Sequence, residues 1–266
     1  MPKKVRIVVL TCLRRDAASR CLEDLAKCRS DGVEIAAVIL AHGSGAPRRR
    51  RLLRKVRKVM SIGLLGAING VRMRKWYREP AKDIVAECRR LGIPFREIEG
   101  LNSAEMIAAF QELEPDLGVS LGNGYISPRV FDIPRLGMIN LHTEILPAYQ
   151  NAQSIIWPIF CNDPYTGYTI HEIVRKIDAG RILLQRRYPI VFKDSLEQTV
   201  RYNKGVTDAK YPRDVAYVVS NIESLKASAI EQKGGRCYTT PSIWQYLKMV
   251  INNRRYYRMQ RKGWCA

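Results

Sequence analysis

Compact apolar runs alternate with segments of helical spacing over the first part of the chain. Residues 5–10 and 34–40 are rich in β-branched side chains, which is typical of strands buried in a parallel sheet. Residues 16–29 lie between them and place apolar side chains three and four positions apart, at Ala18, Cys21, Leu22, Leu25 and Ala26. The order strand, helix, strand predicts a βαβ unit and an open α/β sheet.

The same alternation continues to about residue 195. We expect helices over residues 82–91, 104–113 and 153–160, and strands over residues 116–121, 138–141, 168–174 and 182–191. Beyond residue 195 the pattern weakens, and helices are expected only over residues 223–232 and 243–259. The pattern therefore predicts a main α/β domain over residues 1–200 and a small C-terminal extension over residues 201–266.

Residues 47–78 interrupt this pattern with a basic segment. No acidic residue occurs between Glu34 and Glu79, while arginine and lysine are frequent and Leu52, Leu53, Val56 and Val59 are interleaved at helical spacing. We expect a basic amphipathic helix followed by an apolar turn that contains glycine. Three interpretations stay open for it: a solvated face, a contact with phosphates of a substrate or RNA, and a contact with an anionic membrane surface.

Charge and cysteine usage narrow the class of protein. The 266 residues carry a formal net charge of +20, which favours an anionic partner. Seven scattered cysteines without a Cys-x-x-Cys pair argue against a disulfide framework and a zinc site, so we expect no metal and a reducing, cytoplasmic location. The apolar run near the N-terminus is too short for a secretory signal, and no stretch reaches the ~20 apolar residues that span a bilayer.

Polar residues gather where the strand at residues 138–141 ends. Asn140 and His142 are two positions apart, so their side chains share one face beyond the carboxyl end of the sheet, where open α/β sheets bind ligands. Asp178 lies in a short turn with Gly180, which we expect to supply an unusual backbone angle. From that turn a carboxylate can orient His142.

Several ordered motifs between residues 115 and 190 resemble the catalytic domain shared by the 10-formyltetrahydrofolate-dependent formyltransferases. The family pattern is Asn-x-His, then Leu-Pro-x-Tyr, Gly-x-Thr-x-His and Asp-x-Gly. This chain has Asn140-Leu-His142, Leu146-Pro-Ala-Tyr149, Gly167-Tyr-Thr-Ile-His171 and Asp178-Ala-Gly180, with Ser127-Pro128 upstream. The resemblance implies a Rossmann-like, mostly parallel open sheet and a catalytic domain over residues 1–200, into which residues 47–78 form an insertion.

The resemblance also implies a formyl donor, 10-formyltetrahydrofolate, and an amine acceptor, with no metal. Asn140 would donate a hydrogen bond to the oxyanion, His142 would stabilise it or move the proton, and Asp178 would orient His142. The matching positions for folate are Gly124, Tyr125, Ile126, Ile177 and Asp178. Tyr149, Gln150, Asn151 and His171 are expected to lie beside the acceptor.

The acceptor is the least determined part of this interpretation. Many family members have Arg-Gly where this chain has Gln150-Asn151. We expect a nucleotide-diphosphate amino sugar, used in making a surface polysaccharide, because the chain is too short for the C-terminal domain of methionyl-tRNA formyltransferases. It also lacks the phosphate loop of glycinamide ribonucleotide formyltransferases. Those two acceptors, a formyltetrahydrofolate hydrolase, an RNA- or membrane-binding degenerate fold and a homodimer all stay open.

Overall fold

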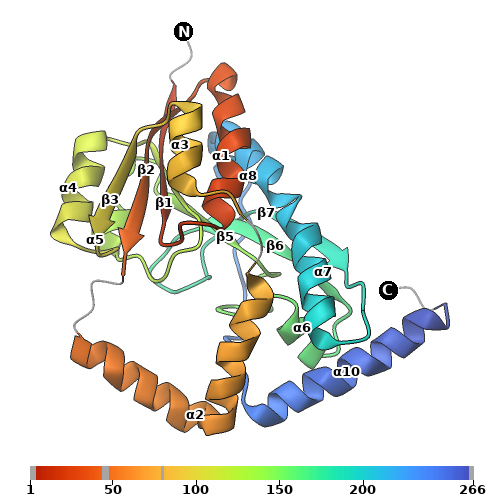
Figure 1. Cartoon of the computed structure of the whole chain (residues 1–266). Coiled ribbons are helices and arrows are strands. Elements are labelled where there is room, and N and C mark those ends of the chain that lie inside the picture. Colours follow the sequence, from red (N-terminus) through yellow and green to blue (C-terminus); the bar gives the residue numbers. More distant parts are fainter. Residues whose placement is uncertain (1–3, 44–47, 79–80, 264–266) are drawn as a thin grey trace.

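The computed structural model describes residues 4–43, 48–78 and 81–263, and these build one seven-stranded sheet with helices on both faces (Figure 1). The strand order is β3-β2-β1-β4-β5-β6-β7. Strands β1 to β5 pair in parallel, and β6 and β7 add to the edge in antiparallel fashion. The predicted Rossmann-like, mostly parallel open sheet is confirmed. The strands are β1 (Val5–Thr11), β2 (Val33–His42), β3 (Phe95–Glu99), β4 (Leu117–Ser120), β5 (Met138–His142), β6 (Tyr165–Glu172) and β7 (Ile182–Pro189).

Two apolar cores lie on opposite faces of this sheet. On one face, α1 (Ala17–Lys27), α3 (Ile84–Leu91) and α8 (Tyr211–Ser220) bury their apolar stripes against the strands. On the other face, α4 (Ala104–Leu113) and α5 (Pro128–Phe131) do the same. The β-branched runs of β1 and β2 are buried because both of their faces are covered.

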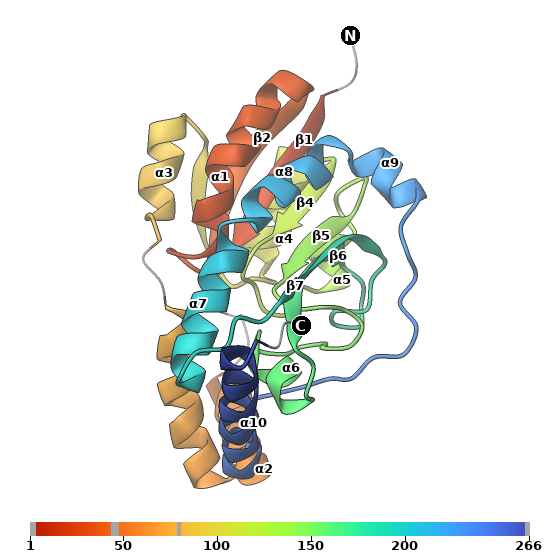
Figure 2. The same cartoon turned by 90° about the vertical axis from the view of Figure 1, so that its right-hand side faces the viewer.

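A third core lies beyond the carboxyl ends of the strands. It joins the end of α2 (Arg48–Arg74) and the turn η2 (Lys75–Tyr77) to α6 (Ile156–Phe160), α7 (Leu196–Asp208) and α10 (Ile243–Arg261). Figure 2 shows α2 and α10 at the same end of the molecule. The remaining short helices are η1 (Cys28–Asp31) and α9 (Ile222–Ala227). Among the described residues no helix is long and apolar enough to cross a membrane.

Two features differ from the sequence-based expectation. The apolar, glycine-containing stretch after the basic helix is not a turn, because α2 continues through it with a kink at Gly63, where φ is 74°. The helices α7 and α8 were not predicted, although Ser195 and Gln198 form a capping box at the start of α7. The boundary expected near residue 200 falls within α7 and stays a prediction.

Candidate functional site

A cavity of about 390 Å³ opens at the carboxyl ends of the central strands. It lies where the strand order reverses between β1 and β4, which is the usual ligand position in sheets of this kind. Its volume is in the range in which proteins bind small molecules. The predicted catalytic residues all line it: Asn140, His142 and Asp178.

The tautomer of His142 is set by the chain itself. Its Nε2 lies 2.8 Å from the backbone carbonyl oxygen of Tyr149. A carbonyl oxygen only accepts, so Nε2 carries the proton, and Nδ1 of the neutral ring keeps its lone pair. That Nδ1 lies 3.6 Å from Oδ2 of Asp178.

The surroundings of His142 and Asp178 shift the pKa values of both groups. Burial lowers the pKa of His142, although the charge of Asp178 opposes the shift. Burial acts to raise the pKa of Asp178, but the neighbouring imidazoles of His171 and His142 and the N–H of Asn151 outweigh it and lower that pKa. A neutral imidazole therefore lies beside an ionised carboxylate, and both offer acceptors for the N–H groups of a ligand.

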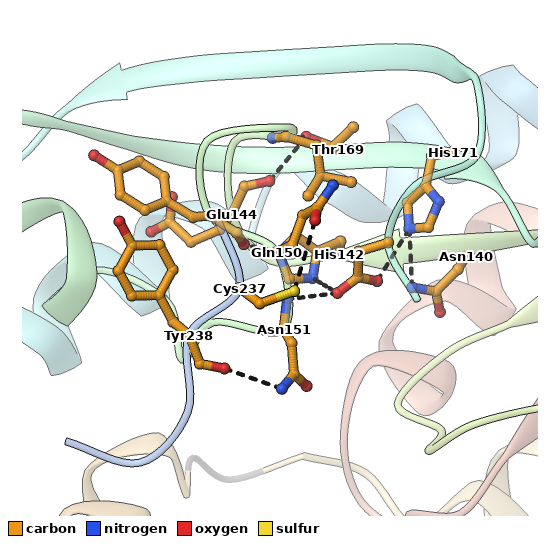
Figure 3. A network of polar contacts seen from close by, with 12 residues as sticks. Asn140, His142, Glu144, Gln150, Asn151, Thr169, His171, Cys237 and Tyr238 are labelled. Atoms are coloured by element: carbon orange, nitrogen blue, oxygen red, sulfur yellow. Dashed lines mark hydrogen bonds and ion pairs between the residues drawn. The ribbon is translucent and has the colours of Figure 1, made fainter. Parts of the chain in front are cut away.

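Asn140 and His171 complete the polar wall of the cavity. Figure 3 shows their side chains next to each other. The Nε2 of His171 lies 3.3 Å from Nδ2 of Asn140 and 3.5 Å from Oδ1 of Asp178. The Nδ1–H of His171 donates to the carbonyl oxygen of Glu172. Because an amide nitrogen carries two N–H bonds, Asn140 keeps one for a ligand oxygen.

The Asp178 turn is shaped differently from the prediction. The unusual backbone angle belongs to Asp178, whose φ is 51°. Gly180 is needed for space, because a Cβ there would lie 1.9 Å from the carbonyl oxygen of Glu172. The close approach of the two backbones therefore requires glycine, and it fixes the turn that presents Asp178.

The loop over residues 144–155 supports this site through its backbone. The N–H of Asn151 donates to Oδ2 of Asp178 at 2.7 Å, and the carbonyl of Tyr149 holds His142. Buried Glu144 holds the loop in place by accepting from the N–H groups of Ile145 and Ile155 and from the hydroxyl of Thr166.

Two of the predicted acceptor contacts lie elsewhere. Asn151 and His171 line the cavity, whereas Tyr149 and Gln150 do not. The hydroxyl of Tyr149 donates to Asp163, and the backbone of Gln150 pairs with the C-terminal segment at Arg236 and Tyr238. Motif position alone did not show that these two side chains turn away from the cavity.

The residues predicted to contact folate lie along one wall of the cavity. Those at 124–126 are called the folate strip below. Gly124, Tyr125, Ile126 and Ile177 line the cavity. Asn102 holds the strip, because its side-chain amide donates to the carbonyl of Tyr125 and its oxygen accepts from the N–H of Ser127.

The sequence reasoning missed Asn123 at the same wall. Its Nδ2 donates to the carbonyl of Leu10 and to Ser120, while its Oδ1 is buried and lacks a hydrogen-bond partner within the described chain. An unpaired buried acceptor beside a cavity calls for a ligand donor. An asparagine between two glycines directly after a strand, as in Gly122-Asn-Gly124, is the signal that was available.

Comparisons with known proteins agree with this geometry. A family model described as formyl transferase matches residues 5–215. The chain belongs to the formyl transferase family. A methionyl-tRNA formyltransferase from Macrococcus caseolyticus is 37% identical over 118 residues, which cover 44% of this chain and 37% of that protein. The match thus spans well under half the length of this curated relative.

Solved structures of the formyl transferase family share the fold. A sugar N-formyltransferase from Shewanella sp. aligns with a TM-score of 0.56 and 12% identity over 94% of this chain and 87% of its own. A glycinamide ribonucleotide transformylase from Symbiobacterium toebii aligns with a TM-score of 0.55 and 15% identity over 83% of this chain and 90% of its own.

Proposed function

We propose that the protein transfers a formyl group from 10-formyltetrahydrofolate to the amine of a nucleotide-linked amino sugar. The observation that carries the proposal is the pairing of a neutral His142 Nδ1 with an ionised Asp178 on the wall of the cavity, 3.6 Å apart. Two adjacent acceptors suit a substrate that brings N–H protons, as an amine does.

The cavity residues fit the folate donor. Ile126, Val174 and Ile177 offer apolar surface to a flat ring, and the unpaired Oδ1 of Asn123 offers an acceptor to a ring N–H. A side chain at Gly124 would meet nothing within 4 Å, so the backbone there is open to the ligand. When bound, 10-formyltetrahydrofolate supplies the carbon that is transferred.

Each polar residue of the wall has one task in the transfer. The amine nitrogen bonds to the formyl carbon, and the bond from that carbon to the folate nitrogen breaks. The remaining N–H of Asn140 stabilises the negative charge on the formyl oxygen. His142 takes the proton of the amine at Nδ1 and returns it to the leaving nitrogen. Asp178 stabilises the imidazolium that exists between these two proton transfers. The leaving folate nitrogen thus gains the proton that the amine loses.

Support for a sugar acceptor comes from the fold comparison and the chain's charge. The likeness to the Shewanella sugar N-formyltransferase extends over 94% of the chain, which is more than for the transformylase. The net charge of +20 suits a diphosphate. The curated relatives act on methionyl-tRNA by name, so that acceptor is the second candidate.

An acceptor panel tests the proposal. Purified protein is mixed with 10-formyltetrahydrofolate, and tetrahydrofolate release is followed with nucleotide-linked amino sugars, glycinamide ribonucleotide, methionyl-tRNA or water alone. Release that depends on an amino sugar is expected. Release with water alone would identify a hydrolase. Turnover only with methionyl-tRNA would make that molecule the acceptor in place of the amino sugar.

Asn123→Ala tests the folate wall in the same assay. Losing a buried hydrogen bond to the donor costs about 1–3 kcal/mol, so its KM for the donor should rise by roughly tenfold while the KM for the acceptor stays the same. Asn102→Ala should weaken donor binding indirectly, by releasing the strip at Tyr125. If both variants keep the wild-type KM for the donor, the result would contradict binding of the folate at this wall. The cytoplasmic location and the homodimer stay predictions.

A further inference from the structure

The helices α2 and α10 expose an unusual amount of apolar surface. Of the 19 large apolar side chains that are exposed among the described residues, 12 lie on these two helices, so the exposure is concentrated at one end of the molecule. They define the α2–α10 face: Leu52, Leu53, Val56, Val59, Met60, Leu64, Leu65, Ile68 and Val71 on α2, and Trp244, Leu247 and Ile251 on α10.

The orientation of α2 is fixed by its buried side. Met73 is fully buried in the third core, and Ile62 and Asn69 are also buried. Gly66 and Gly70 approach the chain before α10 so closely that a Cβ would lie 3.2 Å from Ser242 and 2.5 Å from Thr240. With its inner side held in this way, the helix turns Leu64, Leu65, Ile68 and Val71 outward.

The apolar stripe of α10 faces outward in the same manner. Trp244, Leu247 and Ile251 are three and four residues apart, which places them on one side of the helix. Trp244 is 78% exposed, which is rare for so large an apolar side chain. Arg72 of α2 donates to the hydroxyl of Tyr246 and links the two helices. Figures 1 and 2 show that both helices reach the lower end of the molecule.

The charge of this face is of one sign. Arg57, Lys58, Arg254 and Arg258 accompany the apolar side chains, and neither helix contains an acidic residue. A second copy joined through the same face would bring like charges together. RNA would match the charge but would leave the aliphatic side chains without a partner. An anionic lipid leaflet satisfies both at once.

We propose that the α2–α10 face docks onto an anionic membrane surface. The apolar stripes enter the boundary between headgroups and acyl chains, and the basic side chains bind the lipid phosphates. Docking leaves the cavity beside the membrane, because η2 continues α2 and its Tyr77 lines the cavity. The proposal concerns a surface and does not depend on which amine is formylated.

Vesicle sedimentation tests it with the whole chain. Binding is expected to vesicles that mix phosphatidylcholine with phosphatidylglycerol in equal parts, weak binding to phosphatidylcholine alone, and release by salt. The triple variant Met60→Ser, Leu64→Ser, Trp244→Ser should lose roughly tenfold or more in partitioning. The matched control Tyr217→Ser, Ile230→Ser removes exposed apolar side chains elsewhere and should bind like the wild type. Circular dichroism and the thermal transition show whether each variant is folded.

Tryptophan fluorescence gives a second measurement on the intact face. The sequence has a fourth tryptophan, Trp264, so the measurement uses a Trp264→Phe background. Trp76 and Trp157 are already buried, so a blue shift on adding anionic vesicles should then come from Trp244 and vanish when Trp244→Phe is added. Absence of binding to anionic vesicles, equal binding to neutral ones, or equal loss in the control variant would overturn the proposal. A dimer or an RNA complex that the triple variant abolishes, without vesicle binding, would overturn it as well.

Discussion

Asn151 and Asp178 both have left-handed backbone conformations and are joined by a hydrogen bond. Their φ angles are 52° and 51°, and the N–H of Asn151 donates to Oδ2 of Asp178 at 2.7 Å. Asparagine and aspartate adopt this conformation more readily than other residues that carry a Cβ, which suits both positions. The contact ties the loop that carries Asn151 to the carboxylate that faces His142.

Asn151→Gly should preserve the reaction, because glycine keeps the N–H and adopts a positive φ without strain. We expect kcat within about threefold of the wild-type value. Asn151→Val keeps the N–H but places a β-branched residue at a positive φ, and it should lose far more. A large loss of kcat in Asn151→Gly would show that the side chain itself acts on the acceptor.

Asp178→Asn should lower kcat by about 10²–10⁴-fold, because the imidazolium of His142 loses its counter-charge. The pH profile should change as well. Activity requires neutral His142, so the acidic limb of kcat/KM lies below the ordinary pKa of histidine, 6.5. Burial lowers that pKa and Asp178 raises it. Removing the charge therefore moves the limb to lower pH, and a shift to higher pH would contradict the electrostatic account.

Glu144 should make stability depend on alkaline pH. Burial raises its pKa from 4.5 to about 8, so the folded protein binds a proton that the unfolded chain has lost. The stability contributed by this proton is complete below pH 4.5 and is lost as the pH rises through about 8. The Tm of the wild type minus that of Glu144→Gln should therefore fall between pH 5 and pH 9.

The matched control for that measurement is Glu112→Gln. Glu112 is an exposed glutamate whose side chain is paired with Arg96 at the surface. Its Tm difference from the wild type should stay nearly flat over the same alkaline range. A difference for Glu144→Gln that is equally flat would show that Glu144 is ionised in the folded protein.

Gly180→Ala should distort the turn that presents Asp178. The added Cβ would lie 1.9 Å from the backbone oxygen of Glu172, a residue whose own N–H donates to the carbonyl oxygen of Arg181 beside the glycine. We expect a loss of more than about 2 kcal/mol in the free energy of unfolding, measured in urea. Gly124→Ala is the stability control, since its Cβ meets nothing within 4 Å. Equal stability of the two variants would contradict this reading of the turn.

Most of the fold could be predicted from local pattern. Strands β1 and β2 were found because their β-branched runs are buried on both faces, and α4 was found to the residue, 104–113. The helix α7 was missed because polar residues and Gly205 obscure its apolar stripe. The exposed stripe of α2 has the same spacing as a buried one, so the sequence could not tell which way it faces.

The candidate site followed from the family resemblance more than from physical pattern. Asn140, His142 and Asp178 do line one cavity. The backbone roles of Tyr149 and Asn151 could not be predicted, because hydrogen bonds from main-chain groups leave no residue-type signal. The catalytic roles of Asn140, His142 and Asp178 stay predictions.

Acceptor-dependent release of tetrahydrofolate by the wild type and by His142→Asn tests the central claim most directly. The wild type should release tetrahydrofolate only when an amine acceptor is present. His142→Asn should release almost none, while its binding of the folate donor in a separate titration stays within a few-fold of the wild-type affinity. Wild-type turnover by the variant would contradict the assignment of His142 as the base, and no release by the wild type with any amine would contradict formyl transfer itself.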